Sequence, residues 1–248
     1  VLDLSHENEL FPWEWINKRR DRSISLDDTI SFAPKAWRTW MDGGASVLSK
    51  CTRSVSKLMV SKAADQLPLK GTQEEKALHV IYDFFDGKKH EFEGLAYAVV
   101  KRLLHAHNLS TVEGWITPSS GDGGGDFILR ADIGSDFARV KQIVFGQAKC
   151  VSLKTCISGR DIARTVARLK RGWFGAFVTT SYFSEPVQRE IIEDQYPLIL
   201  VNGRILAETV MLLSSEGGFP SVRKYLENIV SLYPVMITRR RPEEILFR

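Results

Sequence analysis

The sequence predicts an α/β fold: a mixed central β-sheet flanked by helices, with a mainly helical extension at the N-terminus. Hydrophobic residues make up 44% of the 248 positions and charged residues 26%, the usual balance of a soluble globular protein. Segments whose apolar residues recur at helical spacing alternate with short apolar runs typical of buried strands. Such alternation predicts a sheet that helices cover on both faces.

Two helices open the part of the chain with clear periodicity. Thr72 followed by Glu75 is a capping-box pattern, and apolar residues then recur at helical spacing up to Phe85. Gly87 is expected to end this helix. A second helix is expected over residues 90–107, where apolar residues again line one face.

The rest of the chain alternates between short strands and helices. Strands are expected over residues 114–117, 127–131, 140–148, 176–180 and 198–201. Helices are expected over residues 161–171, 186–194, 205–213 and 225–232. A glycine-rich turn separates the first two strands.

Residues 1–70 differ from the rest of the chain. They show no strong periodicity and hold four of the six tryptophans, namely Trp13, Trp15, Trp37 and Trp40. Gly43-Gly44 and Pro68 interrupt the segment. We expect an N-terminal helical extension in which the tryptophans are core anchors, followed by a main domain over residues 71–248 whose core covers about 90–213.

Charge, cysteines and hydropathy set limits on function. Lys and Arg number 34 against 30 Asp and Glu, and the net charge of +4 permits a nucleic-acid partner without requiring one. Three cysteines are a sparse, odd set that suits a reducing compartment. No apolar run approaches the roughly 18 residues of a membrane span, and no signal-peptide pattern begins the chain. We expect a soluble, cytoplasmic protein with no membrane partner.

Polar residues that could carry chemistry gather at one predicted hairpin. Asp126 closes the glycine-rich turn of residues 121–126 and lies at the start of one predicted strand. Gln147, Ala148 and Lys149 lie at the end of the next predicted strand. Residues i and i+2 share a face of a strand, so Gln147 and Lys149 should point the same way. In an antiparallel hairpin the start of one strand lies beside the end of the other. We therefore expect Asp126 to meet Gln147 and Lys149 at one edge of the sheet.

These residue types suit a divalent metal and phosphodiester chemistry. The carboxylate of Asp126, the side-chain carbonyl of Gln147 and the backbone carbonyl of Ala148 are hard oxygen ligands of the kind that Mg²⁺ binds. Lys149 could orient a water or help to deprotonate it, and the glycines would let a phosphate backbone approach. An ordinary glycine turn and a solvated lysine are also typical of such residues. The spacing alone leaves both interpretations open.

A basic segment follows this hairpin. From Lys149 to Gly175 there are seven basic residues and one acidic residue, Asp161, which gives a local net charge of +6. The candidate DNA-binding residues of this segment are Arg160, Arg164, Arg168, Arg171 and Lys154. The four arginines recur at helical spacing and would form one basic ridge. Such a ridge contacts phosphates without reading the base sequence, although a solvated helix face is the common alternative.

Other candidate sites are weaker. His105 and His107 stand two residues apart, which places them on different faces of a helix. Cys150 and Cys156 lack the paired spacing of a zinc site. Ser120, before the glycine turn, has no recognisable base. We expect neither a zinc centre nor a serine hydrolase.

Several segments resemble the catalytic domain of Mrr-like restriction endonucleases, within the PD-(D/E)XK nuclease superfamily. They are, in order, Phe92-Glu93, the turn that ends in Asp126, Gln147-Ala148-Lys149, and residues 175–181 and 200–203. The resemblance covers about half the chain. An Asp, twenty intervening residues and Gln-x-Lys is also the pattern of the MspJI family of modification-dependent endonucleases.

The resemblance implies a role for each matching residue. Asp126 resembles the metal-binding carboxylate, Gln147 takes the place of the usual Glu or Asp, and Lys149 resembles the catalytic lysine. Glu93 resembles the acid that the family carries on a helix near the metal. Gly125 stands where the superfamily has Pro, and Gln147 is neutral, as is normal in the Mrr-like branch. One charge fewer should weaken metal binding, so DNA phosphate is expected to complete the coordination shell.

The resemblance also implies a restriction-endonuclease-like core and an Mg²⁺-dependent DNA endonuclease, with Mn²⁺ as a second usable metal. The expected partner is double-stranded DNA that contains modified cytosine, as for the cleavage domain of a modification-dependent restriction enzyme. Because one site cuts one strand at a time, a homodimer or higher homo-oligomer is expected. Two alternatives stay open: an inactive nuclease fold that binds DNA or serves assembly, and a nuclease effector acting on RNA or on particular structures.

Modification-dependent members of this family pair the nuclease with a sizeable base-flipping reader domain. The first 70 residues look too few for one. We expect such a domain to lie upstream of Val1 or to have been removed, so the sequence does not specify the recognition site.

Overall fold

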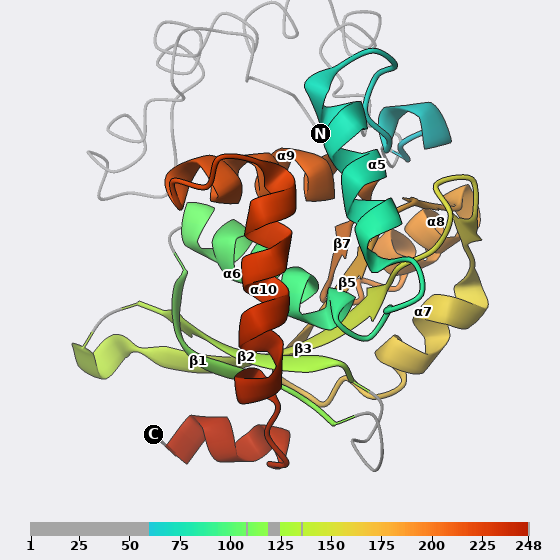
Figure 1. Ribbon diagram of the computed structural model, residues 1–248. Helices are drawn as coiled ribbons and strands as arrows, with labels where there is room; N and C mark the ends of the chain where they lie inside the picture. Colours follow the sequence, from blue (N-terminus) through green and yellow to red (C-terminus); the bar gives the residue numbers. More distant parts are fainter. Residues whose placement is uncertain (1–59, 108, 119–124, 135, 248) are drawn as a thin grey trace, which may run out of the picture. The chain divides into compact units, whose positions relative to one another are not determined.

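The computed structural model describes residues 60–107, 109–118, 125–134 and 136–247 (Figure 1). The helical extension expected over residues 1–70 therefore lies mostly outside the described residues. Within them, residues 60–70 pack against the main domain. The buried Gln66 side chain donates to the carbonyl of Phe183 at 2.9 Å and accepts from its N–H at 2.9 Å. None of the helices in these ranges is long and apolar enough to cross a membrane.

A mixed five-stranded sheet forms the centre of the described part. Its strands are β1 (Ser110–Ile116), β2 (Phe127–Ile133), β3 (Val140–Lys149), β5 (Trp173–Thr179) and β7 (Leu198–Val201). They lie in the order β1-β2-β3-β5-β7. The first three pair antiparallel, whereas β3, β5 and β7 run parallel. Two short strands, β4 (Cys156–Ile157) and β6 (Tyr182–Phe183), pair in parallel and form a separate two-stranded sheet. The predicted mixed α/β fold is confirmed.

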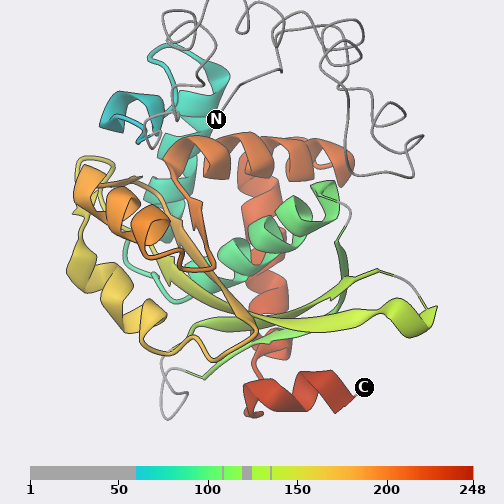
Figure 2. The same cartoon turned by 180° about the vertical axis from the view of Figure 1, so that it is seen from behind.

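Helices cover both faces of this sheet (Figures 1 and 2). On one face lie α5 (Gln73–Phe85), α6 (Phe92–Ala106), α9 (Gly203–Glu216) and α10 (Val222–Met236), which enclose the largest apolar core. On the other face, α7 (Gly159–Val166) and α8 (Glu185–Glu193) pack through Ile162 and Val187 onto Phe177. The C-terminal 3₁₀ helix η3 (Pro242–Phe247) covers β2 and β3 on this same face through Ile245.

Side chains at the helix starts explain where the helices begin. The Thr72 hydroxyl accepts from the N–H of Glu75 at 3.2 Å, as the capping pattern predicts. Ser184, Asn202 and Ser221 cap α8, α9 and α10 in the same way. Each cap satisfies a backbone N–H that has no partner within its helix.

The helix expected over residues 161–171 ends earlier than predicted. The prediction that four arginines form one ridge on this helix is therefore wrong. Helix α7 ends at Val166, and the chain continues in tight turns in which Arg168 N–H bonds to Thr165 O at 3.1 Å. Gly172 then takes a positive φ of 81°, which lets the chain enter β5 at Trp173. Arg160 and Arg164 therefore share a helix, whereas Arg168 and Arg171 lie beyond its end.

Candidate active site

The ends of β2 and β3 create an open stretch of strand edge. The last pair of this ladder joins Phe127 to Gly146, so β3 runs three residues further, to Lys149, without a β2 partner. The N–H of Asp126 donates to the carbonyl of Gly146 at 2.8 Å and so holds the start of β2 against β3. The residue directly before β2 therefore lies beside the last residues of β3.

The Asp126 carboxylate closes over that open edge. Its Oδ2 accepts from the backbone N–H of Ala148 at 2.6 Å and from the side-chain amide of Gln147. The N–H and C=O of one strand residue point to the same side, so the Ala148 carbonyl also faces the β2 side of β3. The contact between Asp126 and Gln147 agrees with the hairpin argument. That argument also placed Lys149 beside Asp126, whereas the structure adds the Ala148 N–H as the second contact of the carboxylate.

Two glycines allow aromatic rings to pack directly beneath this edge. A Cβ at Gly146 would lie 2.1 Å from the ring of Phe127, and a Cβ at Gly125 would lie 2.6 Å from the ring of Phe145. Both rings are buried. Gly125 stands where the resembled superfamily has Pro, and the Phe145 ring gives a physical reason for the difference.

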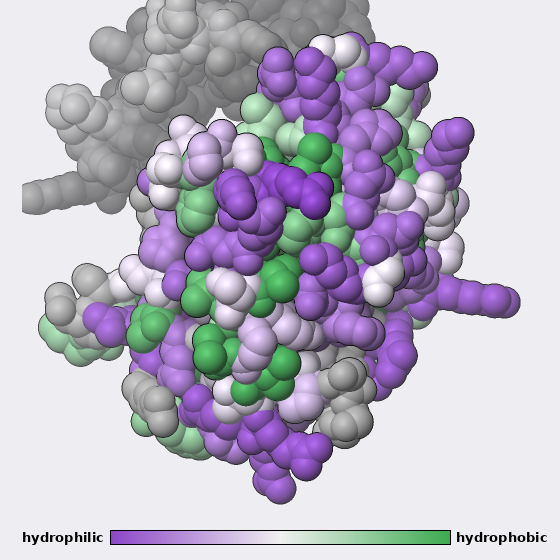
Figure 3. Space-filling view, in the orientation of Figure 1, coloured by the Kyte–Doolittle hydropathy of each residue, from purple (hydrophilic) through white to green (hydrophobic). Residues whose placement is uncertain are grey.

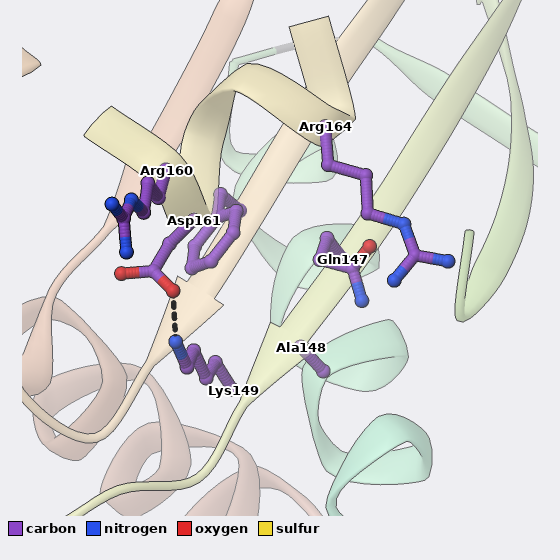
Figure 4. A pocket seen from close by; sticks show the side chains of 7 residues that line it. Gln147, Ala148, Lys149, Arg160, Asp161 and Arg164 are labelled. Atoms are coloured by element: carbon purple, nitrogen blue, oxygen red, sulfur yellow. Dashed lines mark hydrogen bonds and ion pairs between the residues drawn. The ribbon is translucent and has the colours of Figure 1, made fainter. Parts of the chain in front are cut away.

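Lys149 points to the same side as Gln147, but its charge does not pair with Asp126. Its Nζ makes an ion pair with Oδ1 of Asp161, on the first turn of α7 (Figure 4). Partial burial pushes the pKa of Asp161 upward, but hydrogen bonds from Lys149 and Ser158 outweigh it and hold that pKa below its ordinary value. Asp161 is therefore an anion at neutral pH.

A cavity of about 350 Å³ lies between the end of β3 and α7. Its lining residues are Gln147, Ala148, Lys149, Arg160, Asp161, Arg164 and Phe177. Figure 4 shows the Arg164 side chain extending from α7 toward Gln147, with Arg160 near Asp161. Both arginines are exposed, and neither makes an ion pair with the residues that the structure describes. Three cations and one anion give the cavity a positive balance that suits phosphate.

Glu93 lies on the opposite face of the sheet, in the first turn of α6. Its Oε2 accepts a hydrogen bond from the Tyr233 hydroxyl of α10 at 3.0 Å. Burial, and then the charges of Glu93 and Asp126, raise the pKa of that hydroxyl far above its ordinary value. The Tyr233 hydroxyl therefore stays protonated at neutral pH and can donate to Glu93.

The donor set fits a hard divalent cation. Asp126 supplies a carboxylate, Gln147 an amide oxygen and Ala148 a backbone carbonyl, and Mg²⁺ commonly takes one or two carboxylates together with waters and substrate phosphates. No cluster of three or more His, Cys, Asp or Glu occurs within the described ranges.

The remaining predicted DNA contacts do not line the cavity. Lys154 is exposed in the loop between β3 and β4, and Arg171 is exposed just before β5. Arg168 is half-buried, and its Nη1 is enclosed without a hydrogen-bond partner among the described residues.

Two residues of the site were missed by the sequence analysis. Asp161 counted there only as the lone acid of a basic segment. The Ser158-x-x-Asp161 spacing was a usable signal, because it is a capping-box pattern with Asp in the third position. Tyr233 had no comparable signal, since 140 residues separate it from Glu93.

Comparison with known proteins gives a consistent result. Residues 88–210 match the restriction endonuclease family of the Mrr type. The chain is 38% identical to the MspJI restriction endonuclease in complex with a 27-mer oligonucleotide, with a TM-score of 0.75, over 95% of this chain and 53% of that one. Its fold also resembles the DNA modification-dependent restriction endonuclease AspBHI, at 24% identity and a TM-score of 0.61, over 91% and 55% of the two chains. The chain thus spans about half the length of these structures. No curated protein matches.

Proposed function

The chain carries a restriction endonuclease domain of the Mrr type, and we propose that it hydrolyses DNA phosphodiester bonds at the sheet edge formed by Asp126, Gln147 and Lys149. The observation that carries the proposal is the contact of the Asp126 carboxylate with both Gln147 and Ala148, at the place where β3 extends beyond β2. Lys149, Arg160 and Arg164 line a cavity at the same strand end.

Each residue has a task that follows from its position. Asp126, with the carbonyl oxygens of Gln147 and Ala148, would hold Mg²⁺ or Mn²⁺ at the strand edge. When bound, the metal ion supplies Lewis-acid stabilisation of the charge that develops on the phosphate. Lys149 directs an ammonium toward a phosphate oxygen or the attacking water, and Glu93 supports the site from the α6 side.

The basic lining of the cavity suits the DNA backbone. Arg160 and Arg164 lie one helical turn apart and have no ion-pair partner in the described ranges, so a phosphate would be their counter-ion. Arg168, Arg171 and Lys154 lie outside the cavity and would add at most peripheral contacts. We propose double-stranded DNA as the substrate, and DNA with modified cytosine in particular, because MspJI and AspBHI are restriction endonucleases and AspBHI is named as modification-dependent.

The test is cleavage of supercoiled plasmid in modified and unmodified forms, with Mg²⁺, Mn²⁺ or EDTA. We expect Asp126→Ala and Lys149→Ala to lower the cleavage rate by at least about 100-fold, because each removes a charge aimed at the reacting phosphate. Lys141→Ala, at the opposite end of β3, is the matched control and should cleave as wild-type.

Other outcomes identify the alternatives. Binding of DNA without a metal-dependent product from the wild-type protein would indicate an inactive nuclease fold. Cleavage of RNA in place of DNA under the same conditions would indicate an effector nuclease. Full activity of folded Lys149→Ala protein would contradict the assigned role of the lysine.

A further inference from the structure

We propose that Asp161 is a positioning residue for Lys149: its carboxylate, anchored at the start of α7, holds the lysine ammonium toward the cavity at the end of β3. The inference rests on the proposed function, because it assigns a support to the lysine that the nuclease proposal places in the reaction. It adds a residue outside the Asp126, Gln147 and Lys149 pattern.

Asp161 is fixed by contacts that use both of its oxygens. Oδ2 accepts from the backbone N–H of Ser158 at 2.9 Å and from its hydroxyl at 3.0 Å, which completes a capping box. Oδ1 is left for Nζ of Lys149 (Figure 4). The N-terminus of α7 also favours a negative charge at this position. The carboxylate is therefore tied to a helix end and cannot follow the lysine.

Lys149 needs such an anchor because its backbone alone does not place its charge. Strand pairing with β5, and the hydrogen bond from the Thr179 hydroxyl to the Lys149 carbonyl at 3.0 Å, fix the main chain. The side chain is 38% exposed and its charge sits at the end of a flexible four-carbon stem, so the ammonium would otherwise sample many positions. Pairing with a fixed carboxylate limits these positions before substrate arrives, which is the preorganisation that a reacting group requires.

Two simpler explanations make different predictions. A helix cap alone requires only the bonds between Asp161 and Ser158, so loss of the ion pair would leave catalysis unchanged. A restraining contact that keeps Lys149 away from DNA would make catalysis faster when the carboxylate is lost. The positioning role requires slower catalysis with normal substrate binding.

The main variant is Asp161→Asn, assayed for kcat and KM on duplex DNA with the metal that supports wild-type cleavage. Asn has one acceptor oxygen where Asp161 uses two, so either Lys149 or Ser158 loses its partner. We expect kcat to fall by about 10- to 100-fold, with KM within about twofold of wild-type. The matched control is Ser158→Ala, which removes a bond to Asp161 but leaves the ion pair, and its kcat should stay within about threefold of wild-type.

Two further variants separate positioning from a general loss of structure. Asp161→Glu keeps the charge and should recover part of the lost kcat; it also serves as the main variant if Asp161→Asn does not fold, with a kcat below wild-type at unchanged KM as the expected result. In a Lys149→Ala background, Asp161→Asn should cause no further loss under single-turnover conditions, because the residue acts through the lysine.

The outcomes distinguish this inference from the nuclease proposal. A wild-type protein that cleaves no nucleic acid contradicts the proposed function. A cleaving wild-type protein with an Asp161→Asn kcat equal to or above its own overturns only the positioning role. A rise in KM with unchanged kcat would overturn it too, since that result assigns Asp161 to substrate binding.

Discussion

At the scale of single residues, aromatic packing explains why glycines occupy two positions at the strand edge of the candidate site. A side chain at Gly125 would place its Cβ 2.6 Å from the Phe145 ring, and a proline would bring the same Cβ. We expect Gly125→Ala to destabilise the fold by about 1–3 kcal/mol, the usual cost of overpacking a core. The measurement is the free energy of unfolding in urea.

A matched glycine and a compensating change make this prediction specific. Gly159→Ala is the control, because its nearest neighbour would be Glu190 Oε2 at 3.8 Å, an ordinary contact. Its effect should stay within about 0.5 kcal/mol. Phe145→Leu combined with Gly125→Ala should recover part of the loss. Equal stabilities of the Gly125 and Gly159 variants would show that the Phe145 ring moves aside at little cost.

The sequence predicts the site residues that are close along one hairpin and misses those that the fold brings from elsewhere. The contact between Asp126 and Gln147 could be predicted because strand periodicity and antiparallel pairing follow from local sequence. The ion pair of Lys149 could not, because it depends on how α7 packs against β5. The charge count over residues 149–175 does not show which of the seven basic residues Asp161 contacts.

At the scale of elements, the length of α7 decides which arginines act together. Arg160 and Arg164 line the cavity, whereas Arg168 and Arg171 follow the end of the helix at Val166. We expect Arg160→Ala with Arg164→Ala to weaken DNA binding at all sequences alike and to lower the slope of log K against log salt by about 2, since each lost phosphate contact removes about 0.9. The measurement is a salt titration of DNA binding by fluorescence anisotropy.

Two double variants serve as controls for this prediction. Arg168→Ala with Arg171→Ala should change the slope less, because neither side chain lines the cavity. Arg204→Ala with Arg223→Ala, on α9 and α10, removes the same charge from helices away from the cavity, and we expect no change beyond the general charge effect. Equal slopes for all three double variants would mean that DNA does not enter this cavity.

The predicted ends of strands and helices agree with the structure for some elements and not for others. The segment predicted at 198–201 matches β7, because its four residues form a continuous apolar run. Strand β1 begins at Ser110 rather than 114, since it lies at the sheet edge, is half-exposed and has a register shift between Thr111 and Gly114. Helix α7 ends early because the turn at Gly172 must deliver the chain to β5, which helical spacing does not reveal.

At the scale of the whole molecule, one face keeps apolar side chains at the surface. Figure 3 shows them gathered over the front of the domain, where α10 lies in Figure 1. Helix α10 buries Tyr225, Leu226 and Ile229 but leaves Leu232 46% and Val235 79% exposed. The helix was expected over 225–232, and its actual span of Val222–Met236 adds the exposed turn.

One domain has one candidate site, and a duplex has two antiparallel strands. The described ranges contain a single set of Asp126, Gln147 and Lys149, which can hydrolyse one phosphodiester at a time. Cutting both strands at a fixed offset is most simply done by two copies related by a two-fold axis. We therefore propose that double-strand cleavage depends on self-association, whereas one copy only nicks.

Mixing experiments test this dependence directly. Wild-type protein is combined with a ninefold excess of Lys149→Ala protein, allowed to exchange subunits, and incubated with supercoiled plasmid. Most assemblies that contain a wild-type copy then hold only one working site, so we expect nicked circles to accumulate and linear product to fall relative to wild-type alone. A ninefold excess of Asp126→Ala protein should act in the same way, because it too fills an assembly with an inactive site. Linear product in the same proportion to nicked circles as with wild-type alone would show that a single copy cuts both strands.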